Sequence, residues 1–218
     1  MNIKSLSALI SKEFLLEFRQ KATLAGILVY IISTVFISAL SFKRIIEPVV
    51  WNALFWVIFV FISINISGKS FSHETKGKGL YNYLYYKPTQ FIVSKIIYNM
   101  VLMVVLSFIT FFFYSWFVGN IVQNFGMFCL TLLFSSSAFS GVLSLMSAIA
   151  SKANNLSLMA ILSFPVLMPL LIVSIKLGKY SIDDIAWSVS YNYLLILVML
   201  NFVVIALSTI LFNYLWKE

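Results

Sequence analysis

The fold of this chain is decided by one uncharged stretch, residues 96–151, which reads IIYNMVLMVVLSFITFFFYSWFVGNIVQNFGMFCLTLLFSSSAFSGVLSLMSAIAS. It contains no Asp, Glu, Lys, Arg or His and is long enough to cross a lipid bilayer twice, because one crossing helix takes about 20 residues. Residues 68–95, just before it, hold five lysines, Glu74 and the only histidine, His73. An uncharged run behind a basic loop is typical of an integral membrane protein whose loop faces the cytoplasm.

The composition of the whole chain agrees with this interpretation. Hydrophobic residues make up 61% of it and charged residues 10%, against about 25% charged residues in soluble domains. We expect one membrane domain over residues 1–218. The N-terminus lacks the pattern of a cleaved signal, since Glu13 and Glu17 interrupt it and its apolar run is short. The single cysteine, Cys129, has no partner for a disulfide in the chain and is expected to be a small core residue.

Six stretches have the length and apolarity of membrane-spanning helices, and none contains a formal charge: residues 23–42, 49–67, 96–118, 125–150, 153–175 and 191–216. A polar group, Gly119, Asn120, Gln123 and Asn124, divides the long uncharged run into a helical hairpin. The sequence therefore predicts an all-α integral membrane protein with six transmembrane helices.

The distribution of Lys and Arg predicts the orientation. With the N-terminus inside, eleven basic residues face the cytoplasm and four face the outside, the latter being Lys43, Arg44, Lys176 and Lys179. This bias predicts that both termini are cytoplasmic. The net charge of +8 is explained by topology and by anionic lipid headgroups, so we expect no nucleic-acid partner.

Residues 1–21 differ from the spans, because their apolar residues recur at helical spacing among basic and polar ones. This pattern predicts an amphipathic helix lying in the membrane interface, with an apolar side made of Ile3, Leu6, Leu9, Ile10, Phe14 and Phe18. Two interpretations stay open: an elbow helix that docks an intracellular partner, or a lipid anchor leading into the first span.

The cytoplasmic loop, residues 68–95, contains the segment FSHETKGKGLYNYLYYKP over residues 71–88. Leu80 and Leu84 lie one helical turn apart and Pro88 follows, which favours a short amphipathic helix parallel to the membrane. Such a helix suits a contact with a soluble partner. The alternative is an interfacial loop whose tyrosines lie among the lipid headgroups.

Two apparent chemical motifs in this loop fail on their spacing. The residues Gly68, Lys69 and Ser70 resemble the end of a phosphate-binding loop, but that loop needs a glycine where this chain has Ser63. His73 and Glu74 lack the further ligands of a metal site. Because the predicted spans also lack titratable groups, coupling to a proton gradient is disfavoured. We expect no bound cofactor or metal and no enzymatic activity, with energy supplied by a partner.

The fourth and fifth spans contain residues that influence how their helices pack. In the fourth, Ser137 and Gly141 lie four residues apart and allow another helix to approach closely, either within the subunit or across a dimer. In the fifth, Pro165 and Pro169 share one helix face and predict a bend.

The chain resembles the permease subunits of type 2 ATP-binding-cassette exporters, and among them the haem exporter protein B family, CcmB, of cytochrome c maturation. The resemblance covers nearly the whole length. It rests on the amphipathic start, the six spans, the loop with its acidic residue, glycine, Leu80, Leu84 and Pro88, and a fifth span reading Leu162, Pro165, Pro169, Leu170, Leu171 and Ile172.

The resemblance implies a dimer of this subunit in the bacterial cytoplasmic (inner) membrane with two copies of a CcmA-like ATPase and with CcmC-like and CcmD-like haem-handling proteins. ATP is bound and hydrolysed only by the partner. Haem is a candidate cargo; in the alternative, ATP hydrolysis drives the release of a haem chaperone. The coupling residues implied are Phe71, Glu74, Gly79, Leu80, Leu84 and Pro88. Two alternatives remain: a scaffold without a transport path, and a permease for a lipid, drug or polysaccharide.

Overall fold

The computed structural model describes residues 3–19, 21–42, 47–68, 88–153, 155 and 157–215. These residues form seven α-helices and no strand: α1 (Ile3–Arg19), α2 (Lys21–Phe42), α3 (Pro48–Gly68), α5 (Pro88–Phe117), α6 (Phe125–Lys152), α7 (Ser157–Ile182) and α8 (Trp187–Leu215). All of them except α1 are long and apolar enough to cross a membrane. The predicted all-α fold with six spans is confirmed.

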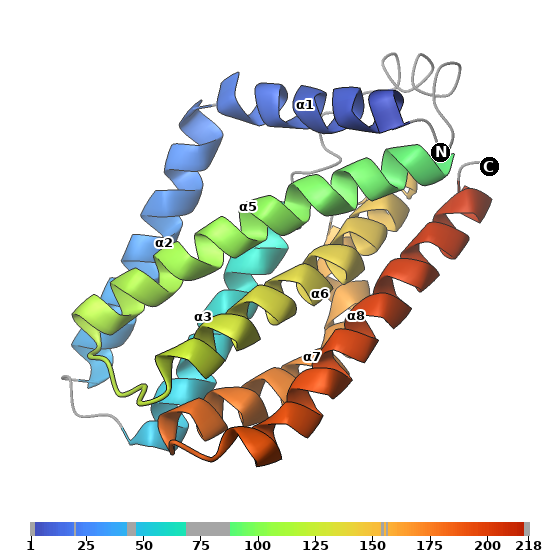
Figure 1. Cartoon of the computed structure of the whole chain (residues 1–218). Helices are drawn as coiled ribbons and strands as arrows, with labels where there is room; N and C mark the ends of the chain where they lie inside the picture. The colour runs from blue at the N-terminus through green and yellow to red at the C-terminus, as the bar shows by residue number, and fades with distance from the viewer. Residues whose placement is uncertain are drawn as a thin grey trace.

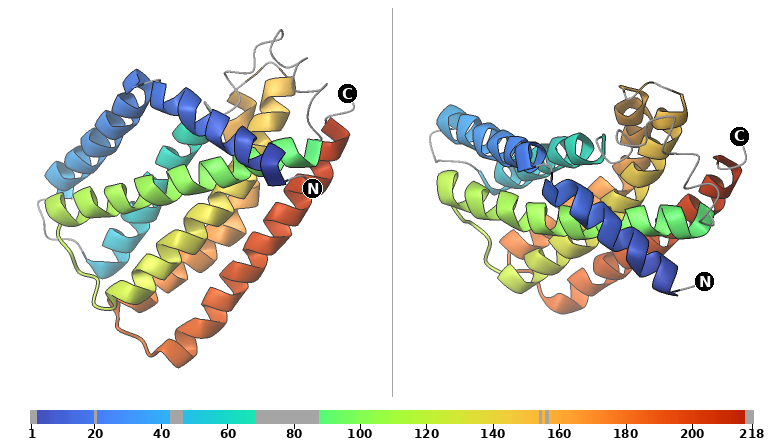
Figure 2. Two further views of the ribbon diagram at one scale, coloured as in Figure 1. Left: turned by 45° about the horizontal axis from the view of Figure 1, so that its top comes forward. Right: turned by 90° about the horizontal axis from the view of Figure 1, so that it is seen from above.

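The six long helices pack side by side, and α1 lies across one end of the bundle (Figure 1). Seen from above, α1 crosses over the first part of α5 (Figure 2). The N-terminus and the C-terminus lie at this same end (Figure 1). The end of α3 at Gly68 and the start of α5 at Pro88 lie at this end as well, so both helix ends that flank the predicted cytoplasmic loop share it with α1.

Helix α6 forms the centre of the bundle. In the most apolar 18-residue stretch of α6, 78% of the residues are buried, whereas in the corresponding stretch of α2 only 17% are buried. Small residues make this possible: Gly141 faces Val204 of α8 so closely that an added Cβ would lie 2.7 Å from Val204 Cγ1. Ser140 Oγ donates to the Ile96 carbonyl of α5 at 2.9 Å. Of the two alternatives for this small-residue face, contact within the subunit is the one observed.

The turn between α5 and α6 forms where the polar group predicted it. Gly119 has a φ of +109°, a conformation that favours glycine. Asn124 caps α6, its Oδ1 accepting a hydrogen bond from Met127 N at 3.1 Å. The indole Nε1 of Trp51 in α3 donates to the Gly119 carbonyl at 2.8 Å. The turn is therefore fixed to the neighbouring helix.

Several helices continue past the charges that were expected to end them. Helix α5 begins at Pro88, so Lys95 and the last part of the predicted loop are helical. Helix α7 continues to Ile182 and includes Lys176. Each lysine has a local partner: Lys95 pairs with Glu13, and Lys176 Nζ donates to Tyr193 Oη at 2.6 Å. Lysine is a good helix former, so a charge ends an apolar stretch without ending the helix, and the helices extend beyond the predicted apolar stretches.

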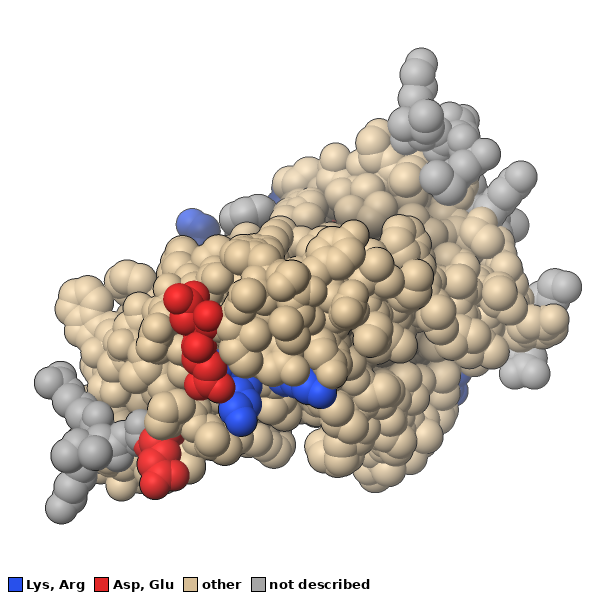
Figure 3. All heavy atoms as spheres, turned by 60° about the horizontal axis from the view of Figure 1, so that its bottom comes forward, with Lys and Arg blue, Asp and Glu red and all other residues tan. Residues whose placement is uncertain are grey.

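The surface shown in Figure 3 is mostly uncharged, with a small group of acidic and basic side chains. Exposed apolar side chains are numerous on α2, α7 and α8, for example Ile37, Ile172 and Phe202 at 62%, 65% and 71% exposure, as expected for helices that face lipid. Pro165 and Pro169 lie within α7 on its exposed side, and the bend remains a prediction. Cys129 is half-buried rather than a fully buried core residue.

Candidate functional site

The candidate site is the end of the bundle where the loop between α3 and α5 is attached. Of the predicted coupling residues, Phe71, Glu74, Gly79, Leu80 and Leu84 lie outside the described residues, as does His73. Pro88 is described: it is the half-buried first residue of α5. Proline is favoured at this position because its missing N–H would have no partner within the helix. The structure therefore shows how the loop is anchored.

The first turns of α5 are deeply buried. Phe91 and Ile92 are 1% and 0% exposed and pack in an apolar cluster with Leu9 of α1, Ala148 of α6 and Phe212 of α8. The rings of Phe91 and Phe212 stack with their centroids 6.0 Å apart. The loop thus leads directly into a segment held by three other helices.

The other end of the loop is held by α6. Ser147 Oγ of α6 donates to the Ser67 carbonyl, next to the end of α3, at 3.0 Å. Its neighbour in the sequence, Ala148, belongs to the cluster around Phe91. Adjacent residues of the central helix therefore contact both of the helix ends that flank the loop.

A buried ion pair joins α1 to α5. Lys95 Nζ lies 3.2 Å from Glu13 Oε2, and their side chains are 2% and 10% exposed. Lys95 Nζ also lies 5.4 Å from the centre of the Phe91 ring, a distance at which a cation and an aromatic face attract each other. This pair could not be predicted, because its two residues are far apart in the chain and Lys95 was expected among the basic residues of the cytoplasmic loop.

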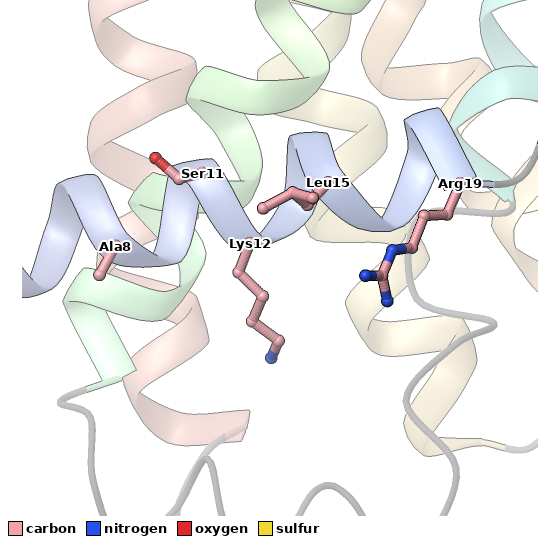
Figure 4. A pocket seen from close by; sticks show the side chains of 5 residues that line it. All are labelled: Ala8, Ser11, Lys12, Leu15 and Arg19. Atoms are coloured by element: carbon pink, nitrogen blue, oxygen red, sulfur yellow. The ribbon is translucent and has the colours of Figure 1, made fainter.

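Helix α1 has two different sides. On the inner side Leu9 is fully buried, and Phe14 meets Tyr98 of α5 edge-on with ring centroids 5.1 Å apart. On the outer side a shallow groove is lined by Ala8, Ser11, Lys12, Leu15 and Arg19. Figure 4 shows the side chains of Lys12 and Arg19 extending to the same side of the helix. The amphipathic helix predicted at the N-terminus is observed, and its apolar residues Leu9 and Phe14 pack on the chain itself.

Buried amides inside the bundle hold helices together. Asn52 Nδ2 donates to the Ile175 carbonyl at 2.7 Å, Asn99 Nδ2 to Ser144 Oγ at 2.7 Å, and Asn201 Nδ2 to the Phe134 carbonyl at 2.7 Å. Each bond links two different helices, which is a common role of polar residues in membrane bundles. Among the described residues no group of three or more His, Cys, Asp or Glu side chains could hold a metal ion.

The comparison with protein families gives one match that spans nearly the entire chain. The sequence model of the family described as CcmB protein matches residues 4–214. This range begins at the second residue of α1, includes the loop between α3 and α5, and ends at the last residue but one of α8. No curated protein matches the chain.

Proposed function

Because the chain belongs to the CcmB family, we propose that it is the permease subunit of an ATP-binding-cassette complex that acts in cytochrome c maturation. Membership of the family makes it a multi-pass membrane component of the haem export system of this process. In the proposal the loop between α3 and α5 receives a CcmA-like ATPase, and ATP is hydrolysed by that partner. The permease converts the movement of the loop into a rearrangement of its helices.

The observation that most supports this proposal is the attachment of both ends of the loop to α6. Ser67 at one end and Phe91 at the other are both held by α6, through Ser147 and Ala148. Two anchors on the most buried helix suit a segment that transmits force.

The charges of the described helices favour an external energy source. Lys95 lies in the second turn of α5, near the end of the bundle, and is paired with Glu13. Between this level and Lys176 near the opposite end, the described residues of the six long helices carry no Asp, Glu, Lys, Arg or His. Transporters driven by ion gradients place ionisable groups near the membrane midplane. A partner that hydrolyses ATP supplies the energy instead.

The proposed assembly is a dimer of this subunit in the bacterial cytoplasmic membrane, with CcmC-like and CcmD-like proteins. Both termini and the loop face the cytoplasm in this arrangement. Two features support the orientation: α1 and the chain termini share one end of the bundle (Figure 1), and α1 exposes Lys12 and Arg19 there. The cargo is haem, or the complex uses ATP to release a haem chaperone.

The direct test replaces Leu80 and Leu84, the two apolar residues of the loop that are proposed to contact the ATPase, by Asp. The double variant should remain in the membrane at the wild-type amount, and co-purification of the ATPase should fall at least tenfold. The matched control is Leu15→Asp, which places the same charge on the outer side of α1, where Leu15 is 58% exposed. Full retention of the ATPase by the loop variant, with loss in the Leu15 variant, would move the docking site to α1 and refute the proposal.

A further inference from the structure

The pair formed by Glu13 and Lys95 has no role in the membrane anchoring or in the loop contact described above. It lies between α1, which leads into the first span, and α5, which directly follows the loop. We infer that Glu13 and Lys95 are positioning residues that lock α1 and the first turns of α5 into one rigid unit. A movement of the loop then displaces α1, and with it the start of α2, together with α5.

The burial of the pair supports this role. A solvated pair of flexible side chains would tolerate many geometries, whereas a buried charge must stay next to its counter-charge. Lys95 is 1% exposed and Glu13 9%. Sliding or tilting α1 along α5 would separate the two groups in an apolar setting, so the pair permits one register of α1 on α5.

The apolar side chains around the ion pair also help to hold α1 in place on α5. Leu9 lies one turn before Glu13 and packs against Phe91 and Ile92. Phe14, next to Glu13, contacts the ring of Tyr98. Apolar contacts flank the ion pair on both sides along α1, and they exclude water from it. Apolar packing has little directional preference, so the two charges determine the register of α1 on α5.

The inference deepens the proposed function and rests on it for its consequence, but its structural content can be tested on the permease alone. Spin labels are placed at Ser11→Cys on the exposed side of α1 and at Trp116→Cys near the far end of α5, in a Cys129→Ser background. Trp116 is 69% exposed and lies about 30 Å along the helix from Lys95, given the rise of 1.5 Å per residue. The distribution of distances between the labels reports the orientation of α1 on α5.

The decisive variant is Glu13→Gln with Lys95→Met, which removes both charges of the pair. We expect the wild-type distribution to be narrow and that of the neutral variant to be at least twice as wide. The charge-swapped variant, Glu13→Lys with Lys95→Glu, should return toward the narrow distribution. Arg19→Gln, a charge change on the exposed side of α1, is the matched control and should leave the width unchanged. An equally narrow distribution in the neutral variant would overturn the inference.

The consequence for function is measured in the complex. The neutral variant should still co-purify the ATPase, yet mature cytochrome c should fall at least tenfold, with recovery in the charge-swapped variant. Normal maturation in the neutral variant, alongside a widened distance distribution, would refute the rigid unit as a part of the mechanism. Failure of the wild-type chain to bind an ATPase would instead refute the proposed function and leave the spectroscopic result intact.

Discussion

Gly178 of α7 lies directly against the side chain of Asn52 in α3. An added Cβ at Gly178 would collide with Asn52 Oδ1 and lie 2.9 Å from Trp56 Nε1. Asn52 is 2% exposed and makes two hydrogen bonds, donating to the Ile175 carbonyl at 2.7 Å and accepting from Trp56 Nε1 at 3.0 Å. The absence of a side chain at Gly178 thus allows a polar contact between two spanning helices.

Replacing Gly178 by Ala should destabilise the protein. The amide of Asn52 cannot retreat without losing its bonds to Ile175 and Trp56, so we expect a loss of about 1–3 kcal/mol in the free energy of unfolding. Gly26→Ala is the control, because a Cβ at Gly26 meets no atom within 4 Å. Thermal unfolding of the detergent-solubilised protein measures both variants. An unfolding temperature for Gly178→Ala equal to that of the control would contradict the close contact of α3 with α7.

The contact between α6 and α8 predicts a compensating pair of substitutions. Gly141→Ala should destabilise the bundle, because the new methyl group would press on Val204 Cγ1. Val204→Ala removes that atom, and the combined variant should be more stable than the sum of the two single effects by about 0.5–3 kcal/mol. Equilibrium unfolding of the four proteins in the cycle gives this coupling. Strict additivity would show that Gly141 and Val204 do not meet.

The proposed orientation of the chain predicts which exposed positions react with an impermeant thiol reagent. In a Cys129→Ser background, Gln123→Cys and Asp183→Cys should be labelled from outside the cell, because both residues are exposed at the end of the bundle opposite α1. Ser11→Cys on the outer side of α1 should be labelled only after the membrane is opened. The reverse pattern of labelling would place α1 and the loop outside, where no cytoplasmic ATPase could reach them.

The span pattern was predictable because it depends on properties that each segment carries by itself. Length and apolarity located the six long helices, and the polar residues between Gly119 and Asn124 located the turn between α5 and α6. The small residues of α6 also predicted its close contacts, since Gly141 and Ser140 lie where neighbouring helices approach. Which helices would approach them could not be read from spacing alone.

The ion pair between Glu13 and Lys95 could not be predicted from the sequence, and the predicted apolar stretch therefore begins at residue 96, after the observed start of α5 at Pro88. A lysine usually marks the end of a span because its charge seeks water. Lys95 finds its counter-charge on α1 instead, so the helix begins at Pro88, before Lys95. A pairing between distant segments becomes visible only when the fold brings the two segments together. The contacts of Leu80 and Leu84 with a partner remain a prediction.

In the proposed mechanism a separate ATPase drives this subunit, and the dependence of cytochrome c maturation on ATP hydrolysis can be measured in cells. Mature cytochrome c is quantified by covalently bound haem in cells that carry the wild-type permease and either an active or a hydrolysis-dead ATPase partner. Hydrolysis-dead partner cells should contain no mature cytochrome c, with the permease present in the membrane at the wild-type amount. Maturation that persists with the hydrolysis-dead partner would contradict this mechanism, because the described spans carry no Asp, Glu, Lys, Arg or His near their centre through which an ion gradient could act.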